Sequence, residues 1–212
     1  MIVIGVTGNL ASGKSEVAEI LKEKGARIFD ADLSARRVVQ KGKPVYKAIL
    51  KLFGKKFLTP GGQIDRRAFA GHVFFHPGDL DKLNTLIHPA VIVDCLNQIQ
   101  CAKRHKGVLV LDVPLLFESK MKNLADVTIV VSTSLKNQLA RAKKKGIPER
   151  LAKRILSSQW PIKKKERMAD FVIQNNGPKA ELKGKVLEIL EKIKQSTGET
   201  PPLERRRIKF ER

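Results

Sequence analysis

Cysteine and aromatic residues are scarce in this chain. Among 212 residues there are two cysteines, one tryptophan and one tyrosine. Cys95 and Cys101 form no C-x-x-C pair, so we expect both to be buried free thiols in a reducing cytoplasm. The histidines lack the spacing of metal ligands, which argues against a zinc site; they are His72, His76, His88 and His105.

Long apolar runs are also missing. No stretch of about 18 consecutive apolar residues occurs, so no membrane span is expected. The N-terminus leads directly into strand-like residues without a basic region or a small-residue cleavage site. We therefore expect no export signal and a cytoplasmic protein.

Acidic residues are outnumbered, with 21 Asp and Glu against 42 Lys and Arg and a formal charge of +21. Such a balance suits polyanionic partners such as nucleotides, phosphorylated cofactors or nucleic acid. A lysine-rich solvated surface explains it at least as well. Stacking of nucleic-acid bases needs aromatic residues among the basic ones, and only Trp160 lies in a basic segment, so specific nucleic-acid binding is not expected.

The most informative stretch is GNLASGKS, residues 8–15, which fits the P-loop pattern G-x-x-x-x-G-K-[ST]. A strand-like run at 2–7 precedes it, and apolar residues at helical spacing follow it. Lys14 can reach β- and γ-phosphates, and the Ser15 hydroxyl can ligate Mg²⁺. The sequence therefore predicts a site for a nucleoside triphosphate, built from Gly8, Ala11, Ser12, Gly13, Lys14, Ser15 and Glu16.

The rest of the chain is typical of an α/β domain with an insertion. Residues 26–30 read as a second strand ending in Asp30-Ala31-Asp32, beside the P-loop, with a short helix over 34–40. Residues 44–105 read as a mostly helical insertion that shapes a pocket for a second substrate, with a helix break or kink at His88-Pro89. Within it, Asp65 is expected to cap a helix that contains Phe69. A central strand at 108–113 leads into residues 114–118, which could form either a core corner or a substrate wall.

The C-terminal third continues the same alternation. A strand is predicted at 127–131, followed by helix caps at 132–134. The basic helical segment 149–168 suits a lid over a triphosphate, or else a solvated basic face. A short strand at 171–173 and an amphipathic helix over 182–193 complete the domain. Residues 196–212 are expected to form a disordered basic tail.

Several segments in this order resemble dephospho-CoA kinases, from about residue 2 to 195. They are the P-loop, DADLSAR at 30–36, LIHP at 86–89, VPLLFE at 113–118, Arg154 with Gln159, and ADFVI at 169–173 with NNG at 175–177. The resemblance implies a P-loop kinase fold: a parallel sheet of about five strands flanked by helices, a CoA-binding helical insertion at 44–105 and a basic lid at 141–168, in one domain spanning 1–195. It implies ATP-dependent phosphorylation of the ribose 3′-hydroxyl of dephospho-CoA, with Mg²⁺. We expect the protein to be a monomer.

The same resemblance implies residue roles. Asp32 matches the catalytic base, and Lys14, Arg141 and Arg154 match groups that approach the phosphates. The substrate-binding positions are Arg36, His88, Leu115 and Phe117. Three loop residues depart from the family pattern: Asn9 and Ala11 replace glycines, and Glu16 replaces a hydroxyl residue. Because alanine favours negative φ, we expect a slightly different loop shape at Ala11.

Some assignments stay open at this point. Asp32 could instead cap the helix at Ser34. Asp112 could assist Mg²⁺ through a water or merely form a turn before Pro114, so it is left outside the catalytic set. Two other functions remain: a P-loop kinase acting on a different nucleoside or nucleotide, and an NTP-regulated nucleic-acid-binding protein.

Overall fold

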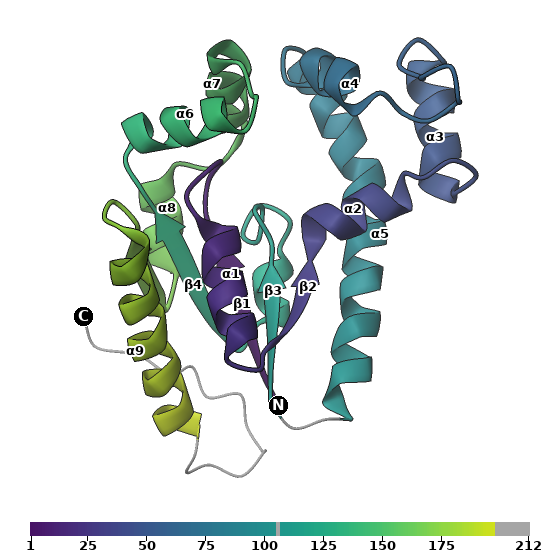
Figure 1. Cartoon of the computed structure of the whole chain (residues 1–212). Helices are drawn as coiled ribbons and strands as arrows, with labels where there is room; N and C mark the ends of the chain where they lie inside the picture. Colours follow the sequence, from purple (N-terminus) through teal and green to yellow (C-terminus); the bar gives the residue numbers. More distant parts are fainter. Residues whose placement is uncertain (105–106, 198–212) are drawn as a thin grey trace.

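The computed structural model describes residues 1–104 and 107–197 and is built on a five-stranded parallel sheet (Figure 1). The strand order is β2-β3-β1-β4-β5, and each neighbouring pair is parallel. The strands are β1 (Ile2–Thr7), β2 (Arg27–Asp30), β3 (Val108–Asp112), β4 (Val127–Ser132) and β5 (Phe171–Gln174). This confirms the predicted sheet, and it brings the carboxyl ends of β1, β2 and β3 together at one edge.

Helices cover both faces of the sheet. On one face lie α1 (Lys14–Glu23) and α9 (Lys179–Thr197), whose buried side chains pack with those of the central strands. On the other face lie α2 (Ala31–Val38), the second half of α5 (Pro77–Lys103) and the short 3₁₀ helix η1 (Met121–Leu124). Strands buried on both faces read as continuous apolar runs, which is why β3 and β4 were recognisable from sequence.

The helical segment between β2 and β3 carries a hydrophobic cluster of its own. It comprises α3 (Pro44–Phe53), α4 (Arg66–Val73) and the first half of α5. Phe53 and Phe69 meet edge to face at 5.1 Å, near the centre of this cluster. Asp65 caps α4 by accepting from the N–H groups of Arg67 and Ala68, which confirms the predicted cap.

Of the break or kink predicted at His88-Pro89, the break is wrong. Helix α5 runs without interruption from Pro77 to Lys103, with Pro89 inside it. A proline within a helix costs about 3 kcal/mol. The helix is held on both sides of Pro89, because Leu83 belongs to the insertion cluster and Val91 and Cys95 belong to the sheet cluster. Burial on either side therefore outweighs the local cost of the proline.

Two further local predictions need correction. Helix α2 begins at Ala31 instead of Ser34, and its cap is Asp30, which accepts from the Leu33 N–H at 2.9 Å. Asp32 is therefore not the cap and lies in the first turn. Cys95 is buried as expected, but Cys101 is exposed, because it lies on the solvent side of α5 while Cys95 faces the core.

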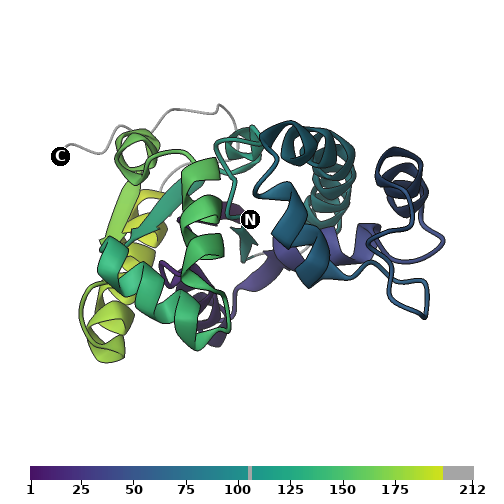
Figure 2. The ribbon, with the colours of Figure 1, turned by 90° about the horizontal axis from the view of Figure 1, so that it is seen from above.

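The predicted lid region consists of three helices, which lie across the sheet edge from the helical insertion. These are α6 (Leu135–Lys144), α7 (Glu149–Ser158) and α8 (Ile162–Met168). Seen from above, α6 and α7 stand on one side of the sheet edge and α3 to α5 on the other (Figure 2). Ser134 caps α6 as predicted, by accepting from the Asn137 N–H.

Lys165 in α8 does not belong to a basic face. It is fully buried, with its Nζ 2.8 Å from Glu118 and 3.1 Å from the Pro114 carbonyl oxygen. Burial lowers the pKa of Lys165, and the neighbouring Glu118 opposes that shift. This lysine fastens the helix to the segment after β3.

Only the first two residues of the predicted tail belong to the described part of the chain, and they are helical. Helix α9 continues through Thr197, whereas residues 198–212 lie outside the described part of the chain. Within residues 1–104 and 107–197, no helix combines the length and apolar character that crossing a bilayer would require.

Candidate active site

The P-loop connects the end of β1 to the start of α1 at the centre of the sheet edge. Gly13 caps α1 with a left-handed φ of 101°, a conformation that favours glycine. A Cβ at Gly13 would collide with the side-chain amide of Asn175, and one at Gly8 with the carbonyl of Val131. Close packing of the loop against β4 and the turn after β5 therefore requires both glycines.

The expectation of a negative φ at Ala11 is wrong. Ala11 adopts a φ of 56°, the left-handed conformation that a glycine would take without strain. For a residue with a Cβ this costs about 1–2 kcal/mol. Hydrogen bonds of the surrounding loop, such as that from the Ser12 N–H to the Asn9 carbonyl oxygen at 3.1 Å, hold Ala11 in this conformation.

Lys14 forms a buried ion pair with Asp112 at the end of β3. Burial raises the pKa of Asp112, and the charge of Lys14 opposes that rise. The two residues are 98 positions apart in sequence, and the register of β1 with β3 pairs Val6 with Asp112. The carboxylate therefore holds the P-loop lysine in place, a role that the sequence did not assign to it.

A cavity of about 650 Å³ opens above the loop and unites most of the predicted site. Every residue from Gly8 to Glu16 lines it, together with four other predicted residues: Asp32, His88, Leu115 and Arg141. The remaining predicted residues, Arg36, Phe117 and Arg154, do not line it. The cavity has room for more than one ligand group, with the loop as its floor.

Asp32 is an exposed carboxylate on the wall of this cavity. It follows β2, whose last residue Asp30 lies in register with Asp112 of β3. Because β3 is also the neighbour of β1, the β2 end stands beside the P-loop. The capping bond made by Asp30 fixes the first turn of α2, and with it the position of Asp32.

The segment after β3 serves as both core and wall. Leu115 lines the cavity, whereas Leu116 and Phe117 are buried in the interior. The Phe117 ring lies toward η1, with its centre 5.8 Å from the Lys122 ammonium. Of the two apolar residues predicted to contact substrate, the structure brings only Leu115 to the cavity.

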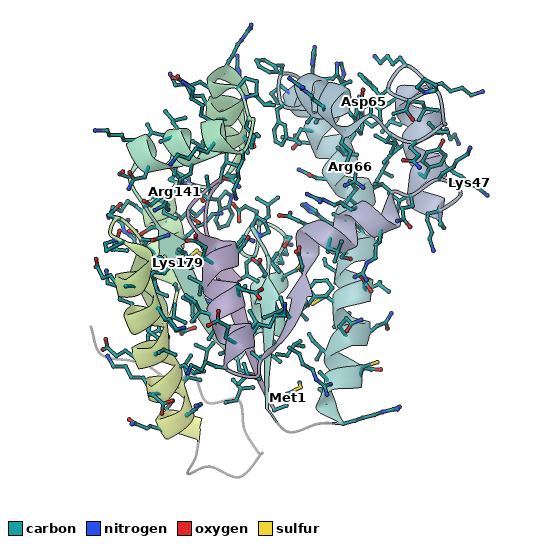
Figure 3. All side chains as sticks on the ribbon, in the orientation of Figure 1. Met1, Lys47, Asp65, Arg66, Arg141 and Lys179 are labelled. Carbon is teal, nitrogen blue, oxygen red and sulfur yellow. The ribbon has the colours of Figure 1, made fainter. Side chains whose placement is uncertain are left out.

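Arg141 reaches the P-loop from α6. Its guanidinium donates to the Ser12 carbonyl oxygen at 3.2 Å and to the Asn175 carbonyl oxygen at 3.1 Å. Asn175 itself donates through Nδ2 to the same Ser12 oxygen at 2.8 Å. Figure 3 shows Arg141 on the α6 side of the loop. No role was predicted for Asn175, although it belongs to the NNG segment at 175–177.

Arg154 and Arg36 lie on opposite sides of the cavity, outside its lining. The guanidinium carbon of Arg154 on α7 stands 5.4 Å from the ring centre of Phe75, which follows α4. Arg150 contacts the same ring at 5.0 Å. These contacts join α7 to the insertion across the opening. Arg36 lies one helical turn beyond Asp32 on α2, with its side chain exposed.

The linker between α7 and α8 is tied to the P-loop, a contact that sequence reasoning missed. Gln159 accepts from the Leu10 N–H at 2.9 Å, and Asn9 donates to the Trp160 carbonyl oxygen at 3.2 Å. The backbone N–H of Trp160 donates to the Glu118 carboxylate at 3.0 Å, which ties the linker to the segment after β3 as well. Asn9, one of the departures from the family pattern, therefore uses its side chain to bind the linker.

His88 lies on the α5 side of the cavity, beside Leu115. Burial lowers the pKa of His88, while the charge of Glu118 opposes that change. The imidazole is therefore predominantly neutral at neutral pH and offers one hydrogen-bond donor and one acceptor.

A P-loop on a five-stranded parallel sheet, with a basic helical region above it and a carboxylate facing it across a cavity, defines a P-loop kinase. Comparison with known proteins gives the particular family. The sequence matches the dephospho-CoA kinase family over residues 2–181, and the chain belongs to this family.

Individual relatives agree over nearly the whole chain. The dephospho-CoA kinase of Bacillus cereus is 39% identical over 191 residues, which cover 89% of this chain and 96% of the relative. The structure resembles TT1252 from Thermus thermophilus, with a TM-score of 0.73 and 28% identity over 92% of this chain and 97% of that one. It also resembles dephospho-CoA kinase from Campylobacter jejuni, with a TM-score of 0.66 and 27% identity over 92% and 98% of the two chains.

Proposed function

We propose that this chain transfers the γ-phosphoryl group of ATP to the ribose 3′-hydroxyl of dephospho-CoA, giving coenzyme A and ADP. One observation carries the proposal: the P-loop and Asp32 line the same cavity. The family relationship supplies the acceptor, since the relatives are named for dephospho-CoA. We propose that the active unit is a monomer.

The donor phosphates would bind to the P-loop. The first N–H groups of α1 have no acceptor within the helix, and they carry the positive end of its dipole. Lys14 would contact the β- and γ-phosphates, and Arg141 would add positive charge from the α6 side. When bound, Mg²⁺ would neutralise phosphate oxygens. Ser15 would hold it, and Asp112 at the end of β3 offers the kind of oxygen ligand that it prefers.

The acceptor hydroxyl would be oriented by Asp32. As the oxygen–phosphorus bond forms, the hydroxyl proton passes to the Asp32 carboxylate, and the bond from the γ-phosphorus to the bridging oxygen breaks to leave ADP. Arg154 is proposed to approach the transferred group when the α6–α7 region moves toward the loop. It would have to leave the Phe75 ring to do so.

A coupled assay of ADP release tests the function. Mg-ATP is supplied with dephospho-CoA, with a panel of nucleosides, or with RNA, each alone. We expect turnover with dephospho-CoA to exceed that with any nucleoside, and no stimulation by RNA. Faster turnover with a nucleoside would replace the proposed acceptor, and stimulation by RNA alone would favour a nucleic-acid-dependent activity.

A further inference from the structure

A buried ion pair connects the segment after β3 to helix α8. Lys165 is fully buried and the Glu118 side chain is only 12% exposed, with Nζ and Oε1 2.8 Å apart. The same Glu118 oxygen accepts from the backbone N–H of Trp160 at 3.0 Å. Lys165 also donates to the Pro114 carbonyl oxygen at 3.1 Å. One ion pair therefore fastens both ends of residues 114–118, and the α7–α8 linker, to a common point.

Stability alone does not account for this ion pair. The second carboxylate oxygen of Glu118, Oε2, is buried and has no hydrogen-bond partner among the described residues. A buried oxygen without a partner loses its contacts with water and gains nothing in return. Apolar residues of similar volume often stabilise a protein as well as a buried ion pair does. A charged pair in this place can instead serve to hold its neighbours in one arrangement.

The neighbours of the pair include the phosphate-binding loop. Trp160, whose N–H is bonded to Glu118, accepts at its carbonyl oxygen from Asn9 Nδ2 at 3.2 Å. Gln159 accepts from the Leu10 N–H at 2.9 Å. Two consecutive linker residues are thus bonded to two consecutive P-loop residues. The position of residues 9 and 10 therefore depends on where Glu118 holds the linker.

A second connection runs from Pro114 to the start of the P-loop. The buried Thr7 hydroxyl at the end of β1 donates to the Pro114 carbonyl oxygen at 3.0 Å, the same atom that accepts from Lys165. The contacts close into a ring, because Thr7 and Asn9 belong to the same stretch of chain. No two members of a ring can separate without straining contacts on both sides. We call this ring the Glu118 network; its members in order are Thr7, Pro114, Lys165, Glu118, Trp160 and Asn9.

The network joins the two sides of the main cavity. Leu115 lies between Pro114 and Glu118 and lines the cavity opposite residues 8–16 of the P-loop. The Ser119 N–H donates to the Leu115 carbonyl oxygen at 2.8 Å, so residues 115–119 form a closed turn. Phosphoryl transfer needs the attacking and leaving oxygens in line. A displacement of 1 Å caused by a distant substitution can lower the rate by about 10²-fold. The spacing that the network sets therefore bears on the transfer step.

We propose that Glu118 is a positioning residue, which sets the spacing between the acceptor wall at Leu115 and the P-loop through Lys165 and the Trp160 N–H. This assignment rests on the proposed function, since it places a donor on the loop and an acceptor against the wall. Glu118 acts through its protein partners and not through contact with a substrate. Loss of the network should therefore slow the transfer and leave the binding of each ligand alone nearly unchanged.

The double variant Glu118→Met/Lys165→Met breaks the network without leaving an unpaired charge. Methionine is flexible and similar in length to both residues, so the fold should be retained, which thermal unfolding checks. With both substrates saturating, kcat should fall by about tenfold or more. Calorimetric titrations with Mg-ATP alone and with dephospho-CoA alone should give dissociation constants close to those of the wild type.

A rescue variant separates positioning from mere burial. In Glu118→Gln/Lys165→Met the glutamine carbonyl still accepts from the Trp160 N–H, so kcat should recover toward the wild-type value. The matched control is Glu149→Met/Lys153→Met, which removes an ion pair between exposed side chains of α7. It should leave kcat unchanged.

A single substitution opens the ring at a different point. Thr7→Val removes the hydroxyl that bonds to Pro114 and keeps nearly the same side-chain shape. Here too kcat should fall while the two dissociation constants stay unchanged. This variant decides the question if the double methionine variant does not fold, and an unchanged kcat in it overturns the proposal.

Amide hydrogen exchange gives a readout that needs no turnover. In Glu118→Met/Lys165→Met the Trp160 amide loses its acceptor and should exchange faster whatever the role of the pair. The informative amide is that of Leu10, whose acceptor is Gln159 and neither of the substituted residues. If the network holds the P-loop, exchange at Leu10 should accelerate as well. A pair that serves only to stabilise α8 leaves the Leu10 amide unchanged.

The outcomes distinguish this assignment from the proposed function. In a folded double methionine variant, either an unchanged kcat or an unchanged exchange rate at Leu10 overturns the positioning role. A large loss of affinity for dephospho-CoA alone overturns it too, because Glu118 would then act by contacting the substrate. If the wild-type protein does not phosphorylate dephospho-CoA, the proposed function fails, and exchange at Leu10 still decides whether Glu118 positions the P-loop.

Discussion

The two sides of the main cavity are constructed differently. The P-loop side consists of residues 8–16 with Asp112, Arg141 and Asn175, and its polar contacts run largely to main-chain atoms. The acceptor side consists of side chains from α2, α5 and the segment after β3, among them Asp32, His88 and Leu115. The P-loop side is thus one continuous stretch of chain held by a few partner side chains. The acceptor side is assembled from elements that are far apart in the sequence.

This difference reflects the chemistry that each side would perform. A triphosphate presents the same oxygens to every enzyme, so a main-chain cradle recognises it without specific side chains. An acceptor is distinguished by its base, sugar and charge, which side chains must recognise individually. We therefore expect substitutions on the P-loop side to affect catalysis with any acceptor, and those on the acceptor side to affect the choice of substrate.

The largest effect is expected for Lys14→Ala. It removes the cation facing the phosphates, and turnover should fall by more than about 10³-fold. It also leaves the buried Asp112 carboxylate without its partner, so the melting temperature should fall as well. The double variant Lys14→Ala/Asp112→Asn removes the stranded charge and should regain stability without regaining turnover. Near-normal turnover in Lys14→Ala would contradict the assigned role.

Asp32→Asn tests the acceptor side at the residue proposed to take the hydroxyl proton. Loss of the base should lower kcat by about 10³-fold, within the range for general base catalysis. Because Asp32 is exposed and does not cap α2, the melting temperature should stay the same. Asp30→Asn is the matched control, since asparagine caps helices as well as aspartate does. A kcat for Asp32→Asn within a few-fold of wild type means that another group takes the proton.

Lys165→Ala tests whether a basic residue of the predicted lid is structural. It leaves the partly buried Glu118 without its cationic partner, and breaking such an ion pair typically costs about 3 kcal/mol or more. Chemical denaturation measures the free energy of unfolding. Lys163→Ala changes an exposed lysine on the same helix and should shift that free energy by less than about 0.5 kcal/mol. Equal effects of the two substitutions would refute the distinction.

The smallest effect is expected for Asn9→Ala, which breaks the side-chain bond between the P-loop and the α7–α8 linker. A hydrogen bond of this kind contributes about 1 kcal/mol, so KM for ATP should rise by about fivefold. Asn97→Ala, an exposed asparagine on α5, is the control. If KM for ATP is unchanged while KM for dephospho-CoA rises, the linker serves the acceptor side instead.

Features that depend on neighbouring residues were predictable. The strand, glycine loop and helix around residues 8–15 were recognised from spacing, and the caps at Asp65 and Ser134 from residue type. Each depends on hydrogen bonds or burial within a few positions of the same stretch. The errors at His88-Pro89 and Ala11 have the opposite cause, because packing against distant elements outweighed a local preference.

Placement of the site residues was predictable only in part. Asp32, His88, Leu115 and Arg141 do meet at the cavity, whereas Phe117 turns into the core and Arg154 contacts Phe75 outside the cavity. Whether a side chain next to a strand end points to the core or the cleft depends on what packs against it. No periodicity in residues 114–118 carries that information.

The amino-acid sequence alone determined the phosphate-binding loop, the α/β alternation and the family, because these follow from residue types at short spacing. Only the tertiary structure decided that Asp112 would hold Lys14 and that Lys165 would be buried on Glu118. The physical reason is that charge and burial act through space. Their partners are set by the stacking of strands and helices that are far apart along the chain.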